Sequence, residues 1–122
     1  MPIVTVEVVS GAREVLADGL AQLLADAVGR ALKSPAGQTW VRLRSLPPEH
    51  YAENETLPET DALPIFVTIL KRQPPEGAYL ENEISALTRA VADLMARPES
   101  CVHIEYAPAA LGRLSFGGRL VK

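Results

Sequence analysis

Apolar and polar residues alternate along four short segments of the chain and recur at helical spacing along two longer segments. Alternation is typical of half-buried β-strands, because successive side chains of a strand point to opposite faces. The predicted strands are 3–9, 39–44, 64–72 and 101–106. The helical spacing predicts two amphipathic helices, over about 12–33 and 78–97. The polar segment 46–63, rich in Pro, Glu, Asn and Thr, is expected to be a surface connection.

The same order of elements occurs twice along the chain. Pro2–Val4 at the start of the first strand matches Pro64–Phe66 at the start of the third, and Val41–Leu43 matches Val102–Ile104. Each half is expected to be a βαβ unit, in which the helix carries the chain back so that two parallel strands can pair. Two such units predict a single α+β domain over 1–122, with a four-stranded mixed sheet and two helices on one face. The predicted repeats span about 2–55 and 63–121.

The sheet face turned away from the helices is expected to be mostly polar. It would carry Thr5, Glu7, Trp40, Arg42, Thr68, His103 and Glu105. Either water covers such a face or other copies of the chain bury it. The tail 113–121 is apolar and contains glycines, so it could extend the sheet edge of a neighbouring copy. We therefore expect a symmetric oligomer, with Trp40 at a subunit interface.

Composition narrows the classes of function. The chain has 122 residues and a net charge of −3, which argues against general binding of nucleic-acid phosphates. No apolar run reaches the roughly 18 residues of a membrane helix, and Met1–Val6 lacks the features of a secretion signal, so we expect a cytoplasmic protein. Cys101 is the only cysteine and is expected to be an inert core thiol. Together with the two histidines, His50 and His103, it provides too few ligands for a zinc site within one chain.

Common catalytic motifs are missing from the sequence. It lacks the glycine-rich nucleotide-binding motifs, the serine-hydrolase elbow, the zinc-protease motif and any CxxC pair. Any chemistry must therefore be simple and use few residues.

Three parts of the chain resemble the tautomerase superfamily: Pro2–Ile3 opening the first strand, Val41–Leu43 in the second, and the ending Leu114–Arg119. That family includes the 4-oxalocrotonate tautomerases, 5-carboxymethyl-2-hydroxymuconate isomerase, the macrophage migration inhibitory factor group and malonate semialdehyde decarboxylase. The resemblance covers essentially the whole chain, whose length is similar to that of the fused-repeat members. It implies a homotrimer that acts on a small carboxylated organic substrate without a cofactor or metal.

Pro2 becomes a free secondary amine if Met1 is removed, as is usual before a small residue. Such an amine can take a proton from a substrate and return it at another atom, provided that it is neutral. An α-amine has an ordinary pKa of about 7.7–8.0, so most of it is protonated at pH 7. Nearby cations and an apolar wall both favour the neutral form. The same cations would bind a substrate carboxylate and stabilise an enolate.

The resemblance assigns roles to three basic residues. Arg42 matches the second-strand arginine that binds a substrate carboxylate in the family, and a solvated charge on the sheet face is the alternative. Arg72 follows the third strand, where decarboxylase-like and dehalogenase-like members carry an arginine beside the proline. Lys33 lies near the active-site lysine of the inhibitory-factor group, although a lysine at a helix C-terminus is also favoured by the helix dipole. Lys71 would point away from Arg72 and is expected to meet solvent.

Three aromatic residues are candidates for the wall of the site. Tyr51 stands near the phenylalanine that walls the site of the short tautomerases, and Phe116 and Tyr106 are further candidates. Ordinary packing is the alternative explanation for each of them.

Three functions follow as hypotheses. The first is a tautomerase or isomerase that interconverts the enol and keto forms of a small carboxylated substrate, with Pro2 as base and acid. The second keeps the fold but hydrates, dehalogenates or decarboxylates a three-carbon acid, with protonated Pro2 as the acid and Glu7, Glu53 or Glu105 activating water. The third is a non-catalytic trimeric interaction protein in which the bond between Met1 and Pro2 stays intact.

Overall fold

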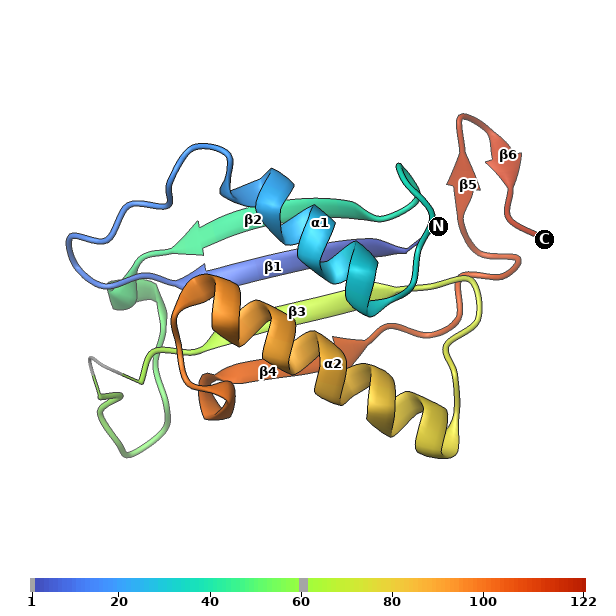
Figure 1. The fold of residues 1–122 in the computed structure, drawn as a ribbon. Coiled ribbons are helices and arrows are strands. Elements are labelled where there is room, and N and C mark those ends of the chain that lie inside the picture. The colour runs from blue at the N-terminus through green and yellow to red at the C-terminus, as the bar shows by residue number, and fades with distance from the viewer. Residues whose placement is uncertain (1, 60–61) are drawn as a thin grey trace.

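A computed structural model of the chain describes residues 2–59 and 62–122 and has two helices packed on one face of a four-stranded sheet (Figure 1). Its strands and helices are β1 (Ile3–Val9), α1 (Leu20–Ala31), β2 (Trp40–Leu46), β3 (Ile65–Leu70), α2 (Gly77–Met95), β4 (Val102–Tyr106), β5 (Ser115–Phe116) and β6 (Arg119–Leu120). Two short 3₁₀ helices, Pro48–His50 and Glu99–Cys101, follow β2 and precede β4. The predicted α+β fold with tandem βαβ units is confirmed.

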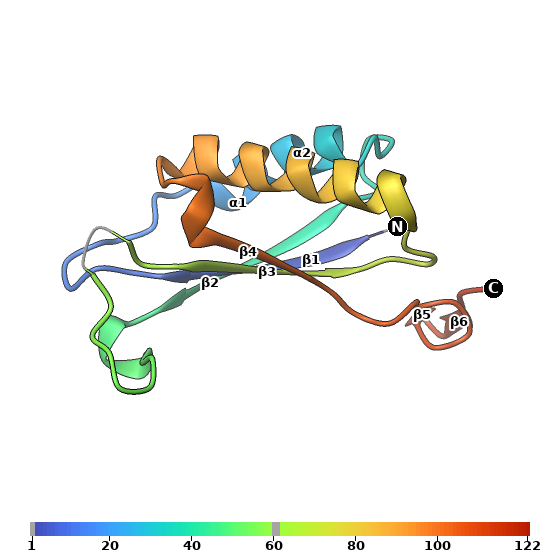
Figure 2. The same ribbon diagram turned by 90° about the horizontal axis from the view of Figure 1, so that it is seen from below.

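The sheet has the order β2-β1-β3-β4. β1 pairs in parallel with β2 and β3 with β4, while β1 and β3 run antiparallel at the centre. Each parallel pair is joined by a helix, because parallel strands need a long crossover connection. Both crossovers place their α-helix on the same face of the sheet, as the edge-on view shows (Figure 2).

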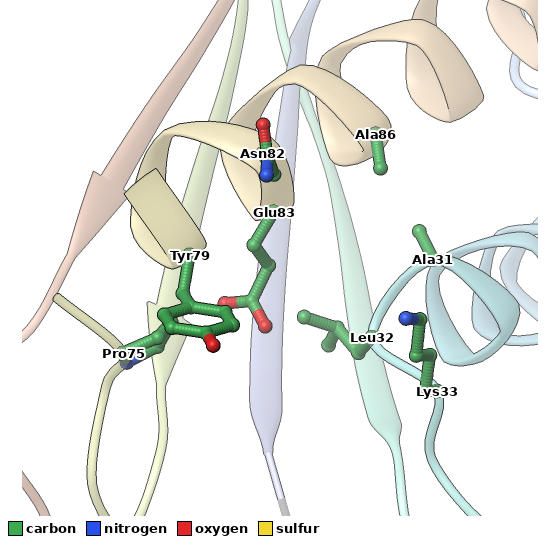
Figure 3. Close-up of a pocket in the computed structure, with 8 residues that line it drawn as sticks. All are labelled: Ala31, Leu32, Lys33, Pro75, Tyr79, Asn82, Glu83 and Ala86. Atoms are coloured by element: carbon green, nitrogen blue, oxygen red, sulfur yellow. The ribbon is translucent and has the colours of Figure 1, made fainter. Parts of the chain in front are cut away.

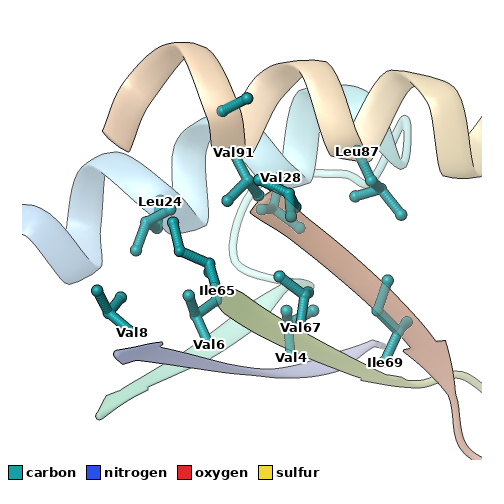
Figure 4. Packing of buried hydrophobic residues seen from close by; sticks show 12 residues of the cluster. Val4, Val6, Val8, Leu24, Val28, Ile65, Val67, Ile69, Leu87 and Val91 are labelled. Atoms are coloured by element: carbon teal, nitrogen blue, oxygen red, sulfur yellow. The ribbon is translucent and has the colours of Figure 1, made fainter. Parts of the chain in front are cut away.

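The core lies between the sheet and the helices, where alternate residues of the two central strands point (Figure 4). The strands contribute Val4, Val6, Val8, Ile65, Val67 and Ile69, and the helices contribute Leu24, Val28, Leu87 and Val91. Each of these side chains is at most 1% exposed. The face assignments made from the alternation of β1 are therefore confirmed, and Cys101 is buried as expected.

Helix α1 begins at Leu20, so the predicted start near residue 12 is wrong. Gly19 precedes the helix with a left-handed φ of 83°, a conformation that ends helical geometry on its N-terminal side. The loop before it is fixed by Glu14, whose carboxylate accepts hydrogen bonds from the Gly11 N–H and from Arg97. The apolar residues of 12–19 therefore continue the helical spacing without forming helix.

The connection between β2 and β3 and the C-terminal tail both contain short structured segments. The connection contains a bridge between Glu53 and Thr56, and its residues 60 and 61 lie outside the described ranges. The tail runs along the end of β3, where the Ala110 N–H donates to the Lys71 carbonyl, and then forms the hairpin β5–β6. Extension of a neighbour's sheet by this tail stays a prediction. Among the described residues, neither helix is long and apolar enough to cross a membrane.

Candidate active site

Pro2 lies buried at the start of β1. Its carbonyl accepts a hydrogen bond of 3.0 Å from the Trp40 N–H, which joins it to the start of β2. Because side chains alternate along a strand, Pro2 shares the helix-covered face with Val4. The predicted removal of Met1 concerns a residue outside the described ranges.

Three basic residues come to the same end of the sheet as Pro2. β1 and β3 are antiparallel and their pairing ends at Ile3 and Leu70, so Pro2, which precedes β1, lies at the same end of the sheet as Lys71 and Arg72, which follow β3. Lys33 ends the turn after α1 with a left-handed φ of 55° and begins the loop that leads into β2. The starts of β1 and β2, the end of β3 and the hairpin β5–β6 all lie at this end (Figure 1).

The side chain of Arg72 is exposed and points to the face opposite that of Lys71. Its Nε–H donates a 2.8 Å hydrogen bond to the main-chain oxygen of Lys122. The terminal nitrogens of the guanidinium have no partner among the described residues, so its planar fork remains available to a carboxylate.

The expectation that Lys71 meets solvent is wrong. Its Nζ lies 2.9 Å from Glu83 Oε1, and only 20% of its side chain is exposed. The alternation that turns Lys71 away from Arg72 places it under α2, where Glu83 is within reach. The other carboxylate oxygen of Glu83 accepts a hydrogen bond from the Tyr106 hydroxyl. Burial, reinforced by Glu83, raises the pKa of Tyr106 above its ordinary value.

Glu83 was not among the predicted site residues, although its position in the helical spacing of α2 pointed to it. Glu83 precedes Leu87 by four residues, so it lies on the buried side of α2. A carboxylate on that side needs a buried partner, because an unpaired charge is costly to bury. Tyr106, considered as an aromatic wall or as ordinary packing, is one of its two partners.

A cavity of about 510 Å³ opens between the end of α1 and the start of α2. It is lined by Ala31, Leu32, Lys33, Pro75, Tyr79, Asn82, Glu83 and Ala86. Figure 3 shows Leu32 and Lys33 on the α1 side, facing Tyr79 and the carboxylate of Glu83 on the α2 side. The cavity thus gives solvent and small solutes access to the carboxylate that holds Lys71.

Phe116 also lies near the Pro2 end of the sheet. Its ring meets that of Trp40 edge to face, with ring centroids 5.0 Å apart, and it is half-buried. The main-chain N–H of Trp40 donates to the Pro2 carbonyl, so Trp40 connects Phe116 to Pro2. Both the wall and the packing interpretations of Phe116 fit this position.

Arg42 and Tyr51 are not brought to Pro2 within one chain. Arg42 is exposed on the sheet face away from the helices, and its guanidinium donates to Thr5 Oγ1 at 3.3 Å. Tyr51 follows the far end of β2, where its ring lies 6.0 Å from that of Phe66. A site that combines either residue with Pro2 therefore needs a second copy of the chain.

The carboxylates considered for activating water also lie elsewhere. Glu53 accepts a 2.6 Å hydrogen bond from the Tyr51 hydroxyl, and Glu7 pairs with Phe66 at the far end of β1. Glu105 is exposed on the face away from the helices. Over 2–59 and 62–122, no three His, Cys, Asp or Glu side chains lie close enough together to hold a metal ion.

Comparison with known proteins rests on structure alone. No family model matches the sequence, and no curated protein matches it. The solved structure of Pt0534 inactivated by 2-oxo-3-pentynoate is similar, with a TM-score of 0.72 and 19% identity over 98% of this chain and 94% of that one. A wild-type fused 4-OT, solved as a symmetric trimer, has a TM-score of 0.72 and 15% identity over the same shares.

A malonate semialdehyde decarboxylase, described with decarboxylase and hydratase activities, has a TM-score of 0.69 and 18% identity over 97% of this chain and 93% of that one. These likenesses cover nearly the whole chain and confirm the predicted fold.

Proposed function

We propose that this chain is a cofactor-independent tautomerase or isomerase that interconverts the enol and keto forms of a small carboxylated substrate. The observation that carries the proposal is the position of Pro2, which is buried at the end of the sheet where β3 is followed by Lys71 and Arg72. An amine in such surroundings is pushed toward its neutral form, which is the form able to accept a proton. The fold shared with proteins of the tautomerase superfamily supports the same activity.

In the proposed reaction, the neutral nitrogen of Pro2 accepts the proton of the enol hydroxyl. The electron pair of that O–H bond forms the carbonyl, and the enol double bond takes a proton at carbon from the Pro2 ammonium. The two proton transfers leave Pro2 neutral again, so no other reactant is needed. The free side of the Arg72 guanidinium would bind the carboxylate and hold the enol next to Pro2.

We further propose that the working form is a homotrimer in which copies of the chain share their sites. The sheet face away from the helices exposes Trp40 (53%) and Phe66, together with Arg42, and a second copy would cover them. Such packing would bring Arg42 and Tyr51 of one copy toward the Pro2 end of another. The symmetric trimer of the fused 4-OT, a protein of the same fold, supports this assembly.

The test combines an intact mass with one substitution. The purified protein is expected to lack one methionine, and P2A is expected to lose the conversion of phenylenolpyruvate to its keto form. P64A is the matched control, because Pro64 is the counterpart of Pro2 in the second repeat and its nitrogen is an internal amide. A P2A variant that folds and keeps full activity would disprove the role of the proline.

A second candidate keeps the fold and changes the reaction to decarboxylation, hydration or dehalogenation of a three-carbon acid. It is favoured by Arg72 at the end of β3 and by the likeness to the malonate semialdehyde decarboxylase with hydratase activity. Here Pro2 would act as a protonated acid. A panel of phenylenolpyruvate, malonate semialdehyde and 3-haloacrylates separates the two, since the better substrate identifies the reaction. A chain that keeps Met1 and converts none of them would indicate the non-catalytic alternative.

A further inference from the structure

Lys71, Glu83 and Tyr106 form a three-residue network between the sheet and α2. Glu83 uses both of its carboxylate oxygens, one for the Lys71 ammonium at 2.9 Å and the other for the Tyr106 hydroxyl. Its side chain is only 13% exposed. A partly buried carboxylate with two partners is held in one orientation, so it also fixes its partners.

The network is next to Pro2. Continued by one residue beyond the pair Ile3 and Leu70, the register of β1 and β3 puts Lys71 opposite Pro2, and the alternation of side chains puts both on the helix-covered face. Side chains opposite each other on antiparallel strands have Cβ atoms about 5 Å apart. Of the two basic residues that follow β3, Lys71 is therefore the one on the face of Pro2.

The charged and titratable groups around this position come from every neighbouring element. They are Lys71 from β3, Glu83 from α2, Tyr106 from β4, Lys33 from the loop after α1, and Arg72, which is on the opposite face and bonded to the Lys122 main-chain oxygen. Glu83 is the single carboxylate in this set. Its removal would leave the Lys71 ammonium without its anionic partner.

We infer that Glu83 is a positioning residue for Pro2, which holds the Lys71 ammonium against the Pro2 nitrogen through the Lys71–Glu83–Tyr106 network. The inference rests on the proposed function of Pro2 and assigns the control of that site to α2. Lys71 favours the neutral amine, whereas the negative charge of Glu83 offsets part of this effect. Tyr106 donates a neutral hydroxyl and orients the carboxylate without adding charge.

The two charged members of the network therefore have opposite effects on the titration of Pro2. K71M removes the cation and leaves the anion, so it moves the midpoint of the Pro2 titration to higher pH. E83Q removes the anion but keeps a side-chain oxygen that can accept from the Lys71 ammonium, so the cation stays in place and the midpoint moves to lower pH. Each shift is expected to be about one pH unit, the usual effect of one nearby charge. K71R keeps the charge and is expected to restore the midpoint of the wild type.

The experiment measures this midpoint in two ways. One is the acid limb of kcat/KM against pH with phenylenolpyruvate, and the other is the ¹⁵N chemical shift of Pro2 in protein labelled with ¹⁵N-proline. E81Q is the matched control, because Glu81 is an exposed residue of the same helix and its loss changes the net charge equally. We expect E81Q to move neither midpoint.

The NMR titration needs no turnover, so the two proposals fail separately. If P2A keeps full activity, the proposed function is wrong, whatever the titration shows. If P2A is inactive but K71M or E83Q moves the midpoint no more than E81Q does, Glu83 is not a positioning residue for Pro2. Urea unfolding of K71M and E83Q shows whether either variant is folded, and K71R tests Lys71 if K71M is not.

Discussion

Replacing Tyr106 with phenylalanine tests the buried network through stability. The Y106F substitution removes the hydroxyl that donates to Glu83 and leaves the aromatic ring in place. A hydrogen bond to a charged group contributes about 1.5–3 kcal/mol to folding. Glu83 keeps Lys71 as a partner and is 13% exposed toward the cavity, so the low end applies. We expect Y106F to lower the free energy of unfolding by about 1.5 kcal/mol at pH 7.

The pH dependence of this difference gives a second check. Burial and Glu83 raise the pKa of Tyr106 in the folded chain above its unfolded value of 10.0. A raised pKa stabilises the fold below pH 10, and this contribution is lost as the pH rises toward the folded pKa. Between pH 9 and 11 the wild type would lose up to about 1.4 kcal/mol relative to Y106F. Partial exposure of Tyr106 reduces this to about 1 kcal/mol.

Urea unfolding at pH 7, 9 and 11 measures both effects, because the linear extrapolation gives the free energy of each protein at each pH. Y79F is the control, since Tyr79 is 82% exposed. The stability gap between wild type and Y106F should narrow from pH 9 to pH 11. A gap that stays constant or widens over this range, or a Y79F effect equal to that of Y106F at pH 7, would refute the buried Tyr106–Glu83 contact.

Three further outcomes are expected. L87A should lower the free energy of unfolding by about 3 kcal/mol in a urea titration, because Leu87 is fully buried. L23A, on the exposed side of α1, should change it by less than about 1 kcal/mol. Equal losses would contradict the described core. R72M should reduce kcat/KM for phenylenolpyruvate about 100-fold and R72K less, since only arginine offers a planar fork; an unchanged kcat/KM in R72M would remove Arg72 from the site. Mixed assemblies refolded from P2A and R42M chains should regain activity that neither variant has alone, if Arg42 of one copy serves Pro2 of another; inactive mixed trimers would exclude that sharing.

Local pattern was enough to predict the fold. The alternation in β1 put Thr5 and Glu7 on the face away from the helices, which leaves Val4, Val6 and Val8 for the core. The repeat of Pro2–Val4 at Pro64–Phe66 predicted two βαβ units. These features depend on residues close together in the sequence. The period of a strand or an amphipathic helix is therefore visible without knowledge of the packing.

The predictions that were wrong concern residues whose structure depends on contacts with distant parts of the chain. Helical spacing extended the first helix back to residue 12, but Gly19 and the bonds of Glu14 to Gly11 and Arg97 make this stretch a loop. Lys71 was correctly placed on the face opposite Arg72, yet its partner comes from α2, 12 residues further along the chain. A sequence pattern shows which face a side chain takes, and the three-dimensional packing decides what it meets there.

The candidate site was predicted only in part, for the same reason. Pro2, Lys33, Arg72 and Phe116 lie at one end of the sheet, whereas Tyr51 lies at the other and Arg42 on the face without helices. The positions of the last two depend on how copies of the chain pack together, which one sequence does not specify. The roles of all six residues stay predictions.

Treatment with 2-oxo-3-pentynoate, the compound that inactivated the structurally similar Pt0534, tests the chemistry of Pro2 most directly. Its alkyne is conjugated to a ketone and reacts with a neutral amine. The protein is treated at several pH values and digested, and the modified peptide is identified by mass spectrometry. We predict a single adduct on the peptide that begins with Pro2, formed faster as the pH rises and accompanied by loss of activity. An adduct on Lys71 or Cys101 instead, or complete labelling of Pro2 with full activity retained, would contradict a neutral catalytic proline.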